Sequence, residues 1–194
     1  GQVNDKVFHP FPPDSMAMHY CPWEMQASIL QSGHFKVTHG DVDPKDVDAD
    51  YVFDCRGTPK DLSQYNTIKN PLNSVILGQK NEVDNNQQWT RAVATLDGWT
   101  FVIPNKKYTS YGYLYNNKMT SDYDARKSMH LAFGVLPDTT VNFDNYVAKE
   151  PIQNDKVILN GNRLLFIEPL EASAVECYLG WTTLVSQWIF DGKS

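Results

Sequence analysis

The chain has 194 residues, of which 41% are hydrophobic and 21% charged, the composition of a soluble globular domain rather than of a disordered or fibrous polymer. Its net charge of -6, with Lys and Arg interspersed among Asp and Glu, offers no basic cluster for phosphate contacts, which argues against a nucleic-acid partner. No apolar run is long enough to span a bilayer and no signal-peptide pattern is present, so no membrane partner is expected either.

The cysteines and histidines point to no disulfide framework and no metal site. Cys21, Cys55 and Cys177 are odd in number and far apart, which favours a reducing, cytoplasmic location. His34 and His39 have no carboxylate or thiol placed to complete a ligand set, so we predict no metal. The start at Gly-Gln without Met suggests an excised segment.

The first part of the chain predicts one helix and two strands. Residues 1–17 form a proline-rich, irregular lead-in. Apolar residues at helical spacing predict a helix over residues 22–30, which Gly33 would end. Residues 35–38 and 51–55 have the composition of strands.

The middle of the chain predicts an antiparallel meander. Apolar and polar residues alternate over four runs, at residues 74–78, 90–96, 99–104 and 111–115. Between the second and third runs, Asp97-Gly98 is typical of the tip of a two-residue hairpin, because type I′ turns need positive φ at both central positions.

The last part of the chain returns to helical patterns. A helix is expected over residues 121–133, with Ser121 as its N-cap and Gly134 as its stop. A short strand, a turn and an amphipathic helix follow at residues 157–159, 161–162 and from 173 onward. The fold class predicted from this order is α+β, a mostly antiparallel sheet (a β-meander) with helices packed on one face.

Two stretches are candidates for chemistry, and the first is aromatic. On a strand, Trp99, Phe101 and Ile103 share one face and end at Pro104, so they present a wall suited to a flat aromatic ligand. The same stripe is also typical of core packed under a helix. The pattern alone leaves both interpretations open.

The second stretch is acidic and precedes the last helix. Glu168 and Glu171 are closely spaced carboxylates with apolar neighbours, at a helix N-terminus whose free N–H groups attract anions. The alternative is that both glutamates only complement the helix dipole. An acid and base pair of a hydrolase is disfavoured, because adjacent carboxylates at a helix entry do not flank a substrate from opposite sides.

Together these stretches resemble the flavin-dependent tryptophan halogenases. Residues 99–104 resemble their W-x-W-x-I-P signature and residues 112–115 their G-Y-V-Y strand. Residues 168–173 resemble their L-E-P-L-E-S-T segment, and residues 49–57 resemble the strand that closes their cofactor domain. The likeness extends over about residues 18–190, and it implies a fold like the substrate domain of p-hydroxybenzoate-hydroxylase-type flavoproteins.

The resemblance implies a reaction and a set of partners. In this family reduced FAD reacts with oxygen, and the resulting flavin hydroperoxide oxidises a halide to hypohalous acid, which reaches the substrate through a lysine. A small aromatic, indole-like substrate, a halide and a flavin reductase would then be the partners. The catalytic glutamate falls on Glu171, and the substrate residues are Trp99, Phe101, Ile103 and Pro104. The halide- and flavin-facing residues are Pro169, Ser173 and Ala174, and the cofactor-binding residues are Gly161 and Asn162.

The chain also departs from the family pattern. Phe101 replaces the second tryptophan, Ala172 and Ala174 stand where the family has Ser and Gly, and Asn162 occupies a turn where related flavoproteins often have Asp. No G-x-G-x-x-G follows a strand, so the phosphate-binding turn and the catalytic lysine would belong to a missing upstream part. We therefore expect the chain alone to bind no FAD.

We expect a single partial domain over residues 1–194, made of four segments. They are a lead-in, a segment returning to the missing FAD domain, the substrate-domain sheet and helix, and a flavin- and halide-facing loop and helix, at residues 1–17, 18–57, 58–160 and 161–194. The main alternative function is a non-catalytic aromatic-ligand-binding domain that has lost its FAD-binding half.

Overall fold

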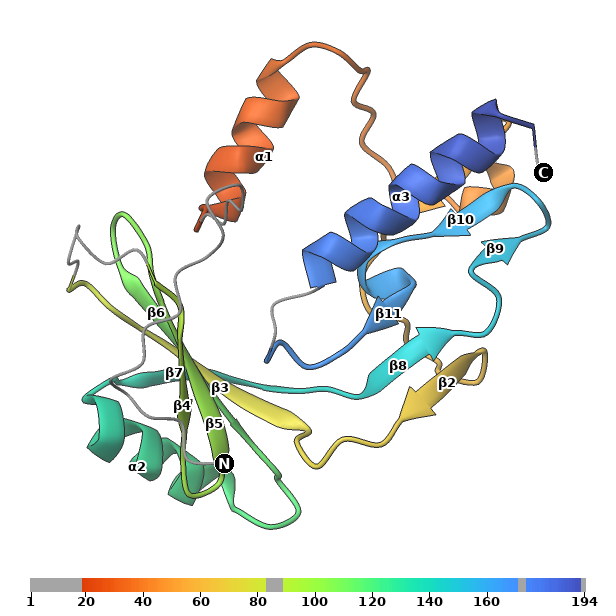
Figure 1. The fold of residues 1–194 in the computed structure, drawn as a ribbon. Helices are drawn as coiled ribbons and strands as arrows, with labels where there is room; N and C mark the ends of the chain where they lie inside the picture. Colours follow the sequence, from red (N-terminus) through yellow and green to blue (C-terminus); the bar gives the residue numbers. More distant parts are fainter. Residues whose placement is uncertain (1–18, 83–88, 171–173, 193–194) are drawn as a thin grey trace. The chain divides into compact units, whose positions relative to one another are not determined.

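The computed structural model describes residues 19–82, 89–170 and 174–192 (Figure 1). Internal contacts divide the chain into two compact units, residues 1–37 and 38–194. The segment boundaries expected at residues 57 and 160 remain predictions.

The first unit contains helix α1 (Pro22–Gln31), as predicted. Pro22 occupies its first turn, where a missing N–H costs no hydrogen bond, and Gly33 follows its end with a φ of 71°. The strand expected at residues 35–38 is wrong, because the segment makes no strand pairing. Phe35 and Val37 are 48% and 49% exposed, so no buried face supports a strand there.

The second unit is built on a five-stranded antiparallel sheet with the order β4-β5-β6-β3-β7. Its strands are β4 (Arg91–Ala94), β5 (Gly98–Pro104), β6 (Thr109–Tyr115), β3 (Ser74–Lys80) and β7 (Pro137–Asn142). The predicted meander and the α+β fold class are confirmed. Successive side chains of a strand point to opposite faces of the sheet. The alternating sequence runs therefore place one set of side chains under a helix and the other set on the opposite face.

Helix α2 (Asp122–Phe133) covers one face of this sheet. Its ends are fixed locally, because the Ser121 side chain accepts the Asp124 N–H and Gly134 adopts a left-handed φ of 61°. Ile76 and Tyr113 of the sheet pack against the helix and are 0% and 1% exposed.

The hairpin between β4 and β5 is present, but its tip lies one residue earlier than predicted. The Thr95 N–H donates to the Gly98 carbonyl at 3.0 Å, so Leu96 and Asp97 are the two loop residues. Asp97 accepts hydrogen bonds from Tyr113 Oη at 2.5 Å and Thr120 Oγ1 at 2.9 Å, which fix it at this position. Gly98 instead belongs to β5, where a Cβ would lie 2.3 Å from the Leu114 carbonyl oxygen.

Two small sheets complete the second unit (Figure 1). One pairs β1 (Val52–Asp54) in parallel with β10 (Val157–Leu159), which also pairs with β9 (Ile152–Gln153). The other pairs β8 (Asn145–Ala148) with β2 (Tyr65–Ile68) and β11 (Leu165–Phe166). The 3-10 turns η1 (Pro44–Asp46) and η2 (Gly161–Arg163) and helix α3 (Ala174–Phe190) complete the elements.

The core of this region forms around β10 and α3. Val157, Leu159 and Leu164 are buried, and Trp181 of α3 packs against them and donates its indole N–H to the Leu159 carbonyl at 2.9 Å. The strand at residues 51–55 is confirmed as β1, but it ends at Asp54 and leaves the thiol of Cys55 exposed. Among the described residues, no helix is long and apolar enough to cross a membrane.

Candidate functional site

The aromatic side chains of β5 lie on the face of the sheet opposite α2. Thr100 pairs with Tyr113, whose side chain packs on α2, so Trp99, Phe101 and Ile103 point to the other side. Trp99 is 9% exposed, and Phe101 and Ile103 are partly exposed. The stripe therefore does not lie under helix α2, but Trp99 is buried, so both interpretations, a ligand-binding wall and ordinary packing, remain predictions. We call these three side chains the aromatic wall.

The wall has a defined ring geometry. Trp99 and Phe101 form a tilted pair with ring centroids 6.2 Å apart. Gly112, which faces Phe101 across the strand pair, has no side chain, and a Cβ at that position would lie 2.1 Å from the Phe101 ring. The ring of Phe101 therefore lies directly over the backbone of β6.

Trp99 also contacts the acidic stretch. Its indole N–H donates to Glu168 Oε2 at 3.1 Å, and the backbone N–H of Glu168 donates to Asn145 Oδ1 at 2.7 Å. Glu168 lies in the loop between β11 and α3, more than one helical turn ahead of Ala174. The sequence left open whether this carboxylate complements the helix dipole, and it did not predict the bond to Trp99, since no local pattern links the two positions.

The remaining predicted halide- and flavin-facing residues lie around the start of α3. Pro169 is exposed, and Ala174 is the first residue of α3 and partly exposed. Glu171 and Ser173 lie outside the described residues, so their roles remain predictions. Pro104 is buried at the end of β5.

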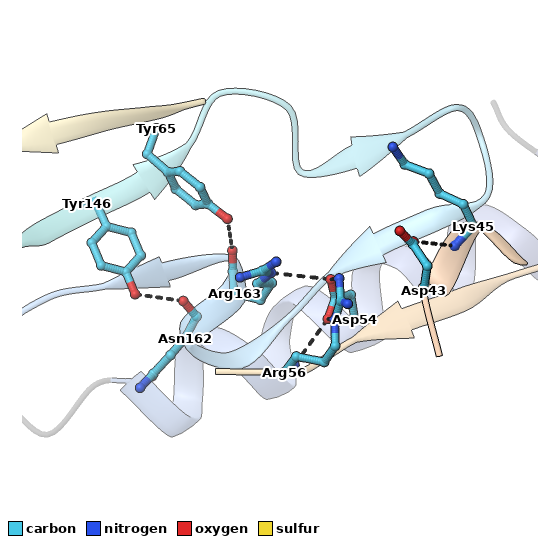
Figure 2. Close-up of polar contacts among 8 residues, drawn as sticks. All are labelled: Asp43, Lys45, Asp54, Arg56, Tyr65, Tyr146, Asn162 and Arg163. Carbon is cyan, nitrogen blue, oxygen red and sulfur yellow. Dashed lines mark hydrogen bonds and ion pairs between the residues drawn. The ribbon is translucent and has the colours of Figure 1, made fainter. Parts of the chain in front are cut away.

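The two predicted cofactor residues lie in η2, directly after β10. Gly161 has a φ of 57°, and apart from its chain neighbours no described residue has an atom within 4 Å of the position its Cβ would take. The Asn162 carbonyl accepts from Tyr146 Oη at 2.8 Å (Figure 2), and Asn162 Oδ1 accepts from Tyr178 Oη at 2.7 Å. Burial raises the pKa of both tyrosines above the ordinary value of 10, so both remain protonated donors well above neutral pH.

A charged cluster that sequence reasoning missed lies beside these residues. Figure 2 shows the carboxylate of Asp54 between the guanidinium groups of Arg56 and Arg163. Arg56 donates through Nε and Nη2 at 2.9 Å each, and Arg163 donates through Nε at 3.3 Å. Burial by itself raises the pKa of Asp54, which is only 4% exposed, but the hydrogen bonds and charges of both arginines outweigh it and hold the pKa below its ordinary value.

This cluster lines a cavity of about 560 Å³. Tyr65, which donates to the Arg163 carbonyl at 2.9 Å, and Lys60 also line it, whereas no residue of the aromatic wall does. Because β1 and β10 are parallel, Arg56 and Arg163 follow the carboxyl ends of neighbouring strands. Ligands of α/β sheets bind at that edge, so it is a second candidate site. Within the described ranges, no three His, Cys, Asp or Glu side chains form a possible metal site.

The chain is similar to known halogenases. The sequence profile of the tryptophan halogenase family matches residues 29–186. BrvH, a flavin-dependent halogenase from Brevundimonas sp. BAL3, has a TM-score of 0.69 and 17% identity, over 86% of this chain and 40% of that chain. The tryptophan halogenase from Shewanella frigidimarina has a TM-score of 0.62 and 25% identity, over 71% of this chain and 30% of that chain.

A third structure, MibH, a lanthipeptide tryptophan 5-halogenase, has a TM-score of 0.61 and 23% identity, over 71% of this chain and 28% of that chain. No match was found among curated protein sequences. The chain thus spans well under half the length of these solved structures, whose shared fold is that of flavin-dependent halogenases. The chain belongs to the tryptophan halogenase family.

Proposed function

We propose that this chain is the substrate-facing part of a flavin-dependent halogenase-like monooxygenase that acts on an aromatic, indole-like compound. The observation that supports this most is the aromatic wall on the face of the sheet opposite α2. Its Trp99 is hydrogen-bonded to Glu168, three positions ahead of the predicted catalytic Glu171. The wall and the acidic stretch, far apart in the sequence, are thereby neighbours.

The wall would recognise the substrate through its ring faces. The indole N–H of Trp99 is already donated to Glu168, and Phe101 and Ile103 have no polar atoms in their side chains. Offset packing of a flat ring on such a surface contributes about 0.5 to 1.5 kcal/mol beyond the area that it buries. The wall would therefore select for a flat aromatic compound, with hydrogen bonds to the substrate supplied by other residues.

The carboxyl edge of β1 and β10 would hold FAD in the intact enzyme, and the residues present there fit this cofactor. Gly161, after β10, offers open space at a positive φ. Four cationic side chains, Arg56 and Arg163 among them, and three carboxylates, Asp54 among them, line the cavity, so its lining carries a small excess of positive charge. When bound, FAD would supply the activated oxygen that oxidises a halide. The phosphate-binding turn is not in this sequence, so we predict that the chain alone retains no FAD.

Glu171, Ser173 and Ala174 would act at the start of α3. Free N–H groups and the positive end of a helix dipole attract a halide, and Pro169 and Ala174 would border the bound halide. The ionised Glu171 would stabilise the positive charge that develops on the aromatic ring. A flavin reductase would deliver the reduced cofactor.

The test is Glu171→Gln in the complete protein, with FAD, a flavin reductase, chloride or bromide and a panel of indoles. Halogenated product is measured by mass spectrometry. We expect kcat to fall by about 100-fold, with KM and melting temperature nearly unchanged, as for a group that acts mainly in the transition state. Glu176→Gln, an exposed carboxylate in the first turn of α3, is the matched control and should retain kcat.

Full activity of the Glu171→Gln variant would contradict the catalytic assignment. Binding of an indole without any turnover by the complete protein would favour the alternative of a non-catalytic aromatic-ligand-binding domain.

A further inference from the structure

We infer that Tyr65, Tyr146 and Tyr178 are positioning residues of the cofactor site, whose hydroxyl groups hold the turn η2 in the conformation that receives the cofactor. The inference rests on the proposed function, in which Gly161 and Asn162 of η2 lie beside FAD. It names the side chains that keep this turn ordered before the cofactor binds.

The turn η2 has few contacts of its own to fix its conformation. It is a 3-10 helix of three residues, in which the Leu164 N–H donates to the Gly161 carbonyl at 2.9 Å. Gly161 adopts a positive φ of 57°, and glycine loses more conformational freedom on ordering than any other residue. A fixed turn at this position therefore depends on contacts from the surrounding elements.

Among the described residues, three tyrosines from three different elements supply such contacts. Tyr65 Oη of β2 donates to the Arg163 carbonyl at 2.9 Å (Figure 2). Tyr146 Oη of β8 donates to the Asn162 carbonyl at 2.8 Å (Figure 2). Tyr178 Oη of α3 donates to Asn162 Oδ1 at 2.7 Å. The last two carbonyls of the turn and one of its side chains are therefore held by residues remote in the sequence.

The tyrosines are themselves fixed by packing. Tyr146 is 1% exposed, and its ring packs edge-on against that of Tyr65, with ring centroids 5.2 Å apart. Both belong to paired strands, since Tyr146 of β8 faces Thr67 of β2. Tyr178 lies three positions ahead of Trp181 on α3, and Trp181 packs against the core of this region. Packed side chains have little freedom to move, so each hydroxyl group is a fixed donor.

The atoms that order the turn differ from those that it offers to a ligand. Apart from its chain neighbours, no described residue has an atom within 4 Å of the position that a Cβ of Gly161 would take. Asn162 Oδ1 accepts from Tyr178, whereas Nδ2 of the same amide has no hydrogen-bond partner among the described residues. A ligand that binds a turn already ordered in this way loses less free energy to conformational entropy.

The variants remove one hydroxyl group each and keep the ring: Tyr65→Phe, Tyr146→Phe and Tyr178→Phe. Tyr115→Phe is the matched control, because Tyr115 is 1% exposed, like Tyr146, and donates to Asp122 Oδ1 at 3.2 Å beside the five-stranded sheet. Loss of a bonded hydroxyl group should lower the melting temperature in all four variants. The conformation of η2 should change only in the first three.

The experiment uses the complete protein, well below each melting temperature. The FAD dissociation constant is measured by fluorescence titration, and amide hydrogen exchange of residues 160–165 is measured without FAD by mass spectrometry. We expect each of the three variants to raise the dissociation constant by about 3- to 10-fold and to speed up exchange in this segment. Tyr115→Phe should stay within about twofold of the unmodified protein in both measurements, despite its lower melting temperature.

Three results would overturn the inference while leaving the proposed function intact. These are an FAD dissociation constant that is unchanged in all three variants, unchanged exchange of residues 160–165 in all three, and a Tyr115→Phe variant that weakens FAD binding as much as they do. The last result would show that the tyrosines act only through overall stability. Failure of the unmodified complete protein to bind FAD would instead refute the proposed function, and the inference with it.

Discussion

Replacement of Gly112 by alanine tests the geometry of the aromatic wall, because the sign of its effect on the unfolding free energy should depend on whether the ring of Phe101 is present. The added Cβ would lie 2.1 Å from the Phe101 ring, too close for any real contact, so the ring must leave its place over β6. Overpacking of this kind costs about 1 to 3 kcal/mol of unfolding free energy. Without the ring, alanine should instead be better than glycine in a strand by about 0.5 to 1 kcal/mol.

The assay is urea unfolding of four forms of the complete protein: unmodified, Gly112→Ala, Phe101→Ala and the double variant. Gly112→Ala should destabilise the unmodified protein and stabilise the Phe101→Ala background, a coupling of at least about 1.5 kcal/mol between the two sites. Gly180→Ala is the control, because no described residue outside the local backbone of α3 has an atom within 4 Å of its Cβ position, and it should be neutral or stabilising. If Gly112→Ala has the same effect in both backgrounds, the ring of Phe101 does not lie over Gly112.

Two further predictions concern Asp54 and the cap of α2. Because the pKa of Asp54 is lowered in the folded state, its ion pairs contribute stability that is fully present above the ordinary value of 3.8 and is lost as the pH falls through the lower folded pKa. Asp54→Asn should therefore lower the unfolding free energy at pH 7 by about 2 to 4 kcal/mol, measured by urea titration. The unfolding free energy of the variant should also decline less steeply below pH 4 than that of the unmodified protein. An unchanged pH dependence below pH 4 would contradict the pairing with Arg56 and Arg163. Ser121→Ala should lower the unfolding free energy by about 1 kcal/mol in the same assay, because the Asp124 N–H loses its acceptor. Lys127→Ala, at an exposed position of the same helix, is the control and should not lower it. Equal effects of the two substitutions would argue against the cap.

The sequence by itself determined the elements whose signals are local. Helix α2 begins and ends where predicted, because Ser121 accepts a bond from a residue three positions on and Gly134 takes a φ that other residues avoid. The alternation of β5 and β6 likewise predicted the meander, since a strand with one buried face needs period-two patterning. The five-stranded order and the shorter strands, such as β8 and β11, have no comparable local signal.

Only the tertiary structure decided which polar groups meet. Trp99 and Glu168 are separated by 69 positions, and Asp54 and Arg163 by 109, so no pattern within either segment could pair them. The sequence also placed the hairpin tip at Asp97-Gly98, whereas the bonds of Asp97 to Tyr113 and Thr120 draw it one residue earlier. Local propensity differences are worth about 1 kcal/mol or less, whereas a hydrogen bond to a charged group, such as each of these carboxylates, is worth about 1.5 to 3 kcal/mol.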